Sequence, residues 1–136
     1  MATLAQNLSA ISQAMNLRSQ RHQILASNIA NADTPHYKAR DFDFQAAMQN
    51  AMAGRMEAGG IALAQTAAGH IAGGSTSGAA NVQYRKETQS AVDGNTVDMD
   101  VERAQIAENA MQYQILTQLI GDKFKGLRSA LASTSG

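Results

Sequence analysis

The sequence predicts a mainly α-helical fold: long amino- and carboxyl-terminal helices pack as an antiparallel coiled-coil pair, with a glycine-rich, partly β insert between them. Apolar residues near each end recur with alternating spacings of four and three, the repeat of helices that pack along one another. Eight of the eleven glycines fall between residues 54 and 94, so the middle differs in composition from both ends. Six aromatic residues and no tryptophan leave little bulky material for a thick globular core.

The amino-terminal helix is expected within residues 1–35. Arg18 and His22 occupy two positions of its apolar repeat and leave a polar gap in the seam. Pro35 ends the helix, because proline lacks an amide donor and restricts the residue before it. The residues expected to form the packing and subunit-interface seam of this helix are Leu4, Leu8, Ile11, Met15, Leu25 and Ile29.

The carboxyl-terminal helix is expected within residues 97–132. Acidic residues gather at its start, in 98–102, and basic residues near its end, in 123–128, and both match the helix macrodipole. Gly121 and Gly126 lower its helix propensity and are small enough to admit a close neighbour. The residues expected to form its packing and subunit-interface seam are Ile106, Tyr113, Ile120, Phe124, Leu127 and Leu131.

Residues 36–96 are expected to hold a turn, a short helix and a flexible or small β insert. Phe44, Met48, Met52 and Met56 recur every fourth residue, which indicates a short amphipathic helix. Residues 61–65 and 82–84 alternate in polarity and have the pattern of a small hairpin. Such a hairpin is marginal unless it packs on something else.

The charge balance and the absence of cysteine exclude several classes of function. Eleven basic residues cancel eleven acidic ones, which removes the long-range field that would draw the chain to nucleic acid or to an anionic membrane. No apolar run approaches the roughly 20 residues that cross a bilayer, and the first 30 residues lack the pattern of a secretory signal. Without cysteine there is neither a disulfide nor a catalytic thiol.

The residue pattern also argues against a metal site, a cofactor and an enzyme. His22, His36 and His70 match no zinc or haem spacing, and we expect no bound metal or cofactor. No serine stands in a distinctive nucleophile context, and the sequence shows no pair of carboxylates on a scaffold able to form a cleft. We therefore expect a protein without catalytic activity.

An excess of apolar surface points to assembly. Leu17 and Ile24 add a second stripe beside the seam of the first helix, and one partner helix cannot cover both stripes. The first 40 residues carry four basic residues against one acidic, whereas residues 87–109 carry six acidic residues against one basic. This asymmetry favours end-to-end complementarity between molecules. Subunits that bind head to tail build an open tube or filament when the rotation between copies does not close.

Three segments resemble the bacterial flagellar axial proteins. Residues 26–44, ASNIANADTPHYKARDFDF, resemble the motif near the amino end of that family, in which an asparagine-rich helix end is followed by a threonine and an aromatic turn. Residues 93–114, DGNTVDMDVERAQIAENAMQYQ, and 123–127, KFKGL, are similar to carboxyl-terminal signatures of the proximal rod proteins. The residues that this resemblance assigns to a rod-motif turn are Asn28, Asn31, Thr34, Pro35 and Tyr37.

The resemblance implies a structural subunit of the flagellar basal body that is exported without a cleaved signal peptide into the periplasmic rod. The terminal helices would form an inner tube domain around the export channel, and the middle would be an outer element. The implied partners are other copies, other rod proteins, the adaptor FliE and the export-gate subunit FlhB, with peptidoglycan nearby. Phe44 and Met48 fit the spacing that the gate reads in early substrates, although any amphipathic helix provides that spacing.

His36 departs from the family pattern, because relatives often have glycine after the proline. If the turn requires a positive φ, histidine is strained there. Outside the flagellar family, the remaining alternative is a secreted coiled-coil adaptor or chaperone that binds one client through its apolar seam. Stoichiometry separates the two functions: a rod subunit enters a helical assembly, whereas an adaptor forms a discrete small complex.

Overall fold

The computed structural model describes residues 3–53, 80–86 and 92–133. Three helices account for most of them: α1 (Leu4–Ala30), α2 (Phe44–Met52) and α3 (Met99–Ser133). Two short strands, β1 (Arg40–Asp41) and β2 (Gln83–Tyr84), lie between the helices in the chain. The mainly helical fold with a small sheet in the middle is the one that the sequence predicts.

Local signals set the ends of the two long helices. Thr3 and Gln6 form a reciprocal capping box at the start of α1, so two amide donors that lack helical partners are satisfied. Asn31 follows its last turn and donates its amide to Ser27. At the start of α3, the Asp98 carboxylate accepts the amides of Asp100 and Val101, which is helix capping.

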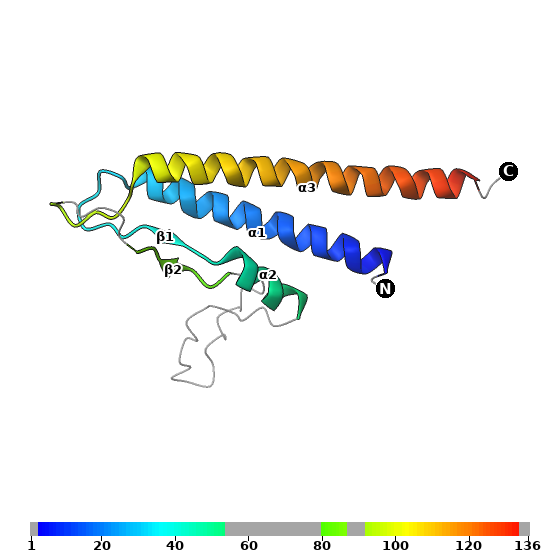
Figure 1. The fold of residues 1–136 in the computed structure, drawn as a ribbon, viewed down its shortest axis with the longest axis horizontal. Coiled ribbons are helices and arrows are strands. Elements are labelled where there is room, and N and C mark those ends of the chain that lie inside the picture. The colour runs from blue at the N-terminus through cyan, green and yellow to red at the C-terminus, as the bar shows by residue number, and fades with distance from the viewer. Residues whose placement is uncertain (1–2, 54–79, 87–91, 134–136) are drawn as a thin grey trace, which may run out of the picture.

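The long helices lie side by side and run in opposite directions (Figure 1). Arg18 bonds to Asn109 and Arg21 bonds to Gln105, and these contacts fix the register of the pair. With 35 residues against 27, α3 extends past the amino terminus of α1. At about 1.5 Å per residue the two helices are roughly 52 and 40 Å long.

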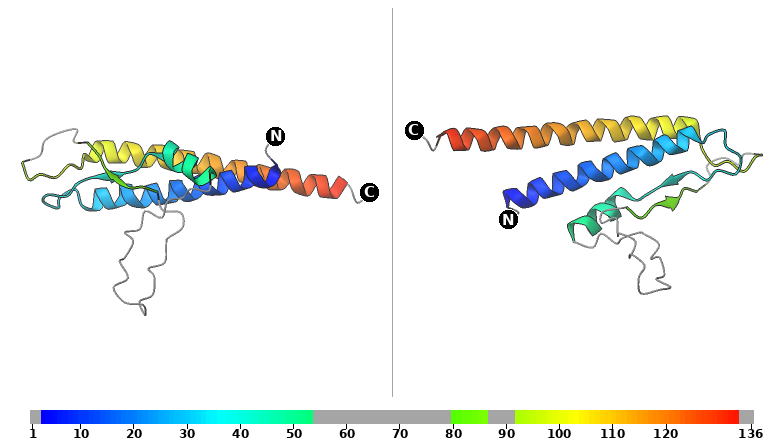
Figure 2. Two further views of the ribbon diagram at one scale, coloured as in Figure 1. Left: turned by 90° about the horizontal axis from the view of Figure 1, so that it is seen from below. Right: turned by 180° about the vertical axis from the view of Figure 1, so that it is seen from behind.

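A middle arm, residues 36–53 and 80–86, packs along α1 on the side away from α3, as Figures 1 and 2 show. Its strands are antiparallel, with Arg40 opposite Tyr84 and Asp41 opposite Gln83. The expected strand at 82–84 is therefore present, and its partner in the described sheet is β1, which nothing in the residue pattern predicts. Residues 61–65, the other half of the expected hairpin, and Met56 of the expected short helix lie outside the described residues.

The apolar core lies where the arm meets α1, and it is small. Leu17, Phe42, Ala47 and Ala80 are buried together, and Ile24 and partly buried side chains of α2 pack against them. Leu17 is fully buried, so the second stripe of the first helix supplies the core residue, and the expected seam runs beside it. None of the described helices is long and apolar enough to cross a membrane.

Candidate functional site

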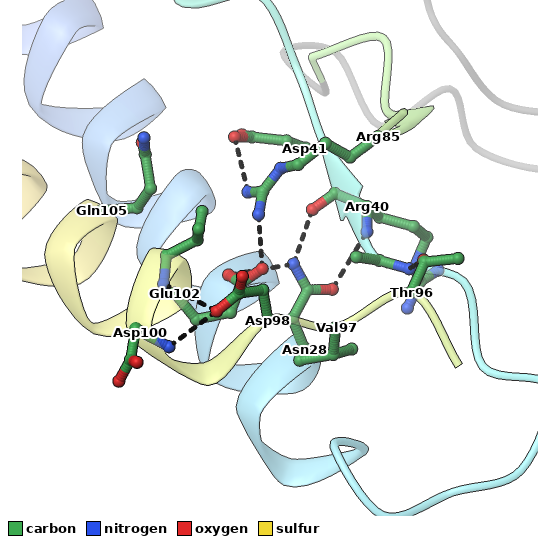
Figure 3. Close-up of polar contacts among 12 residues, drawn as sticks. Asn28, Arg40, Asp41, Arg85, Thr96, Val97, Asp98, Asp100, Glu102 and Gln105 are labelled. Atoms are coloured by element: carbon green, nitrogen blue, oxygen red, sulfur yellow. Dashed lines mark hydrogen bonds and ion pairs between the residues drawn. The ribbon is translucent and has the colours of Figure 1, made fainter. Parts of the chain in front are cut away.

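A fully buried asparagine joins the end of α1 to the arm. The Asn28 amide nitrogen donates to the Arg40 carbonyl at 2.7 Å, and its oxygen accepts the Arg40 amide at 3.0 Å (Figure 3). The same oxygen accepts the Tyr37 hydroxyl at 3.2 Å, and the nitrogen also reaches Glu102 of α3 at 3.3 Å. Asn28 thus exchanges two hydrogen bonds with the Arg40 backbone, as a neighbouring strand would, and its side-chain amide donates twice and accepts twice. Only an amide side chain both donates and accepts in this way.

Two arginines and two carboxylates lie beside Asn28. Arg21 donates two parallel hydrogen bonds of 3.0 Å to the Asp41 carboxylate and another of 2.6 Å to the Gln105 side chain. Arg85 bridges Asp41, at 3.0 Å, and the fully buried Glu102. A lone buried charge is costly, and the two arginines, which are partly exposed like Asp41, balance the fully buried Glu102 and Asp41. The cluster, called the polar clasp below, consists of Arg21, Asn28, Asp41, Arg85, Glu102 and Gln105.

The polar clasp shifts the pKa values of two of its members. Burial alone would raise the pKa of Asp41, but hydrogen bonds from Arg21 and from the Phe42 amide, with the Arg21 charge and Arg85, outweigh it and lower the pKa. The pKa of Arg21 is raised, chiefly by its hydrogen bond to Asp41 and against the effect of burial. Both shifts favour the ionised Arg21–Asp41 pair at neutral pH.

The turn after α1 is bound to the segment that precedes α3. The Asn95 side chain lies within 2.9 Å of the Asn31 and Ala32 carbonyls and 2.8 Å of the Thr34 carbonyl. Thr96 accepts the Ala39 amide through its hydroxyl at 2.8 Å. The segments 26–44 and 93–114, which carry the resemblance in the sequence, therefore form one site in space.

His36 is the backbone outlier of this turn. Its φ is 60°, in the left-handed region, and its amide donates to the Asp93 carbonyl at 3.0 Å. Gly94 faces it with a φ of 73°, and a Cβ there would lie 2.9 Å from the His36 Nδ1. The φ at position 36 is therefore positive, which is the condition under which the sequence predicts strain for histidine.

Arg18 fills the polar gap in the seam. Its guanidinium lies 3.7 Å from the centre of the Phe44 ring and 3.4 Å from the Asn109 side chain, which donates back to the Arg18 carbonyl at 2.8 Å. Burial, followed by the nearby Arg21 charge, lowers the pKa of Arg18. His22, the other polar residue of the seam, is exposed at the rim of a groove of about 280 Å³ between α1 and α3.

The structure brings the turn residues together and divides the seam residues by exposure. Asn31 bonds to the Ser27 carbonyl and to Thr34, while Pro35 is exposed. Phe44 and Met48 are partly buried against the core. The seam residues fall into three groups by exposure. Ile11 and Leu25 are buried. The half-buried ones are Leu8, Met15, Ile29, Ile106, Ile120 and Leu127, and the exposed ones are Leu4, Tyr113, Phe124 and Leu131.

The polar clasp is the part of the site that spacing along the chain does not predict. Glu102 looks like one of several acids at a helix start, yet its side chain is fully buried. Its partner Arg85 lies 17 residues away, and Asp41 lies 44 residues from Arg85. No local pattern links residues at such separations.

Comparison with known proteins identifies the family. The sequence profile of the family described as "Flagella basal body rod protein" matches residues 8–38. The chain is 49% identical over 121 residues to the flagellar basal body rod protein FlgB of Salmonella typhimurium, covering 88% of each chain. It is 46% identical to the Escherichia coli FlgB over 89% of each chain, and 42% identical to a Cereibacter sphaeroides FlgB over 88% of each. With this identity over most of its length, the chain belongs to the FlgB family of flagellar basal body rod proteins.

Proposed function

We propose that this chain is a structural subunit of the proximal rod and polymerises with other rod proteins into the tubular shaft of the basal body. The observation that carries the proposal is the concentration of exposed apolar side chains on α3, which supplies six of the eleven large ones among the described residues. A helix that turns its apolar side chains to water needs a partner outside the molecule. The exposed apolar side chains of α3 are Met111, Tyr113, Ile115, Leu119, Phe124 and Leu131.

In this assembly the pair α1–α3 forms the inner tube domain around the export channel, and the middle arm forms the outer element. The polar clasp supports this division, because it holds the arm against the pair through directional bonds and so keeps one orientation of the two parts. The neighbours are other copies, other rod proteins and the adaptor FliE, with peptidoglycan near the outer element. The subunit turns over no substrate and binds no cofactor.

Export through the flagellar type III machine delivers the chain to the periplasmic rod. The gate subunit FlhB reads Phe44 and Met48. In the folded chain Arg18 covers the Phe44 ring at 3.7 Å, and Met48 packs against the core. Recognition therefore precedes the docking of α2 on α1.

Complementation tests the proposed function. A strain that lacks its own FlgB is given an epitope-tagged copy of this chain, and basal bodies are purified. We expect restored swimming and the tagged chain inside the purified rods. Restored swimming with the tag absent from the rods, or the chain held only in a small soluble complex with one client, would contradict the proposal and favour an adaptor.

A further inference from the structure

The middle arm carries an open cavity of about 350 Å³ that none of the polar clasp residues lines. Its lining residues are His36, Tyr37, Lys38, Arg40 and Tyr84. Two phenol rings therefore lie beside an imidazole, an ammonium and a guanidinium group, all of which can donate hydrogen bonds. We call it the tyrosine–cation cavity.

The tyrosine–cation cavity lies on the outer side of the arm. Successive side chains of an extended chain point to opposite faces, so Lys38 and Arg40 share one face and Ala39 points to the other. Ala39 is fully buried, whereas Lys38 and Arg40 are exposed. Tyr84 lies opposite Arg40 in the sheet, and its side chain is 75% exposed. The cavity is therefore open to a ligand from the side away from the helix pair (Figures 1 and 2).

The charge of the cavity is positive. None of the described residues that line it is acidic. The acidic residues of the arm are Asp41, which belongs to the polar clasp, and Asp43, which caps α2. The whole chain has equal numbers of basic and acidic residues, so the positive charge here is a local concentration. Such a concentration attracts anions, and lysine and arginine donate strong hydrogen bonds to carboxylates.

The backbone of the cavity is already hydrogen-bonded. The Ala39 amide donates to the Thr96 hydroxyl and its carbonyl accepts the Arg85 amide, both at 2.8 Å. The amide and the carbonyl of Arg40 are both bonded to the Asn28 side chain. A peptide therefore cannot add to β1 as a further strand, because that mode of binding needs free backbone groups. A ligand of the cavity is met by side chains, which this bonded backbone holds in place.

Exposed tyrosine rings beside cations fit a sugar that bears a carboxylate. Tyrosine presents an apolar ring and a polar hydroxyl, and a pyranose likewise has an apolar face of C–H groups and a rim of hydroxyls. The ring of Tyr84 can stack on such a face while Lys38 and Arg40 bind the carboxylate. The cations alone suffice for an acidic peptide, which leaves the exposed Tyr84 ring without a contact.

We propose that the tyrosine–cation cavity binds a glycan whose sugars carry carboxylates, either directly or on a short substituent. The natural source of that glycan rests on the proposed function. Around a periplasmic rod the source is peptidoglycan, whose sugars bear short peptides with carboxylates. The inference thus gives the outer element a direct contact to the glycan that the proposed function only places nearby.

Co-sedimentation of the purified full chain with insoluble peptidoglycan sacculi tests the proposal. We expect the wild type to bind the sacculi, and amidation of their carboxylates to weaken binding about fivefold or more. K38Q/R40Q should weaken binding to a similar extent, because two cations of the cavity are lost. K125Q/R128Q removes the same charges from exposed positions of α3 and is the matched control, which should bind as the wild type does.

Two further variants test the role of the ring. Tyr84→Ala should weaken binding severalfold, whereas Tyr84→Phe keeps the ring and should retain most of it. Circular dichroism of each variant shows whether the fold is kept, and a variant that keeps its fold and loses binding supports a direct contact. Poly-L-glutamate is added as a competitor, because it carries carboxylates without sugars, and we expect it to displace the chain only weakly.

The outcomes that overturn the inference are distinct from those that overturn the proposed function. Equal binding by K38Q/R40Q and K125Q/R128Q, or no binding of the wild type to sacculi, would exclude the cavity as a glycan site. Full displacement by poly-L-glutamate with Tyr84→Ala unchanged would assign the cavity to an acidic peptide. A wild-type chain that enters the rods without binding sacculi overturns this inference alone, whereas one that binds sacculi and never enters the rods overturns the proposed function alone.

Discussion

His36 shows at the scale of one residue how a strained backbone can persist in a well-bonded turn. Its φ of 60° is unfavourable for any side chain with a Cβ, yet its amide bonds to Asp93 and the flanking segments are tied together through Asn95 and Thr96. The bonds around the turn therefore impose the conformation. Glycine would satisfy the same bonds without the steric cost.

Replacing His36 with glycine is expected to stabilise the chain. The free energy of unfolding should rise by about 1 kcal/mol, because the relief of backbone strain outweighs the extra conformational freedom that glycine gives the unfolded chain. Urea denaturation of the purified protein measures it. Gly94→Ala serves as the converse variant and should destabilise, because its Cβ would meet the His36 ring and its φ is 73°. A His36→Gly protein less stable than wild type would show that the imidazole contributes more than its backbone costs.

The residue scale also shows where sequence reasoning stops. The asparagines of the turn could be picked out, because asparagine at a helix end before a proline favours a turn. The partners of Asn28 could not, since Arg40 and Glu102 reach it from the arm and from the far helix. Burial of Glu102 depends on Arg85, whose position is set by the pairing of β2 with β1. The charge of a side chain can be read from a sequence. Its burial cannot be read when it depends on contacts between residues far apart in the chain.

At the scale of elements, predictability follows the range of the interactions. The helices α1 and α3 were predictable because the apolar repeat of each helix and the acidic residues at the start of α3 are local signals. Strand β1 is two residues long, and its partner lies more than 40 positions away, so it has no local period to detect. The short helix was predictable from its spacing, and its start at Phe44 is fixed by the Asp43 cap.

Helix α2 supplies the element-scale prediction. Alanine at both Phe44 and Met48 is expected to reduce secretion through the flagellar machine several-fold, because both side chains proposed to contact the gate are lost. Secreted and cellular amounts of the chain are compared by immunoblot. Phe42→Ala is the matched control, since it removes a more deeply buried phenylalanine from the same core and leaves Phe44 and Met48 in place. Equal losses of secretion in both variants would assign the effect to folding and not to recognition.

At the scale of the whole molecule, the arm and the helix pair are joined by a small apolar core and by the polar clasp. The core contributes Leu17 and Phe42 among mostly small residues, so the clasp carries an unusual share of the orientation between the two parts. Its charges come from α1, β1, α3 and the residue that follows β2, and the Asp41 carboxylate contacts two arginines. The attachment of the arm should therefore depend on ionisation in a way that the pairing of the helices does not.

Stability is accordingly expected to fall in acid through Asp41. Its pKa is lower in the folded chain than the unfolded value of about 3.9, so its contribution is fully present above that value. As the pH falls through the folded pKa, the carboxylate is protonated and the contribution is lost. Asp41→Asn should cost about 2 kcal/mol at pH 7, because two arginines lose their shared partner, and it should flatten the pH dependence below pH 4. Urea denaturation between pH 3 and pH 7 measures both effects.

Asp122→Asn is the control, because it removes an exposed carboxylate whose contact to Lys125 is 3.6 Å. It should leave the pH dependence of the free energy of unfolding as it is in the wild type. If Asp41→Asn retained the acid dependence of the wild type, other carboxylates would have to carry it, and the clasp would not be what ties the arm to the helices.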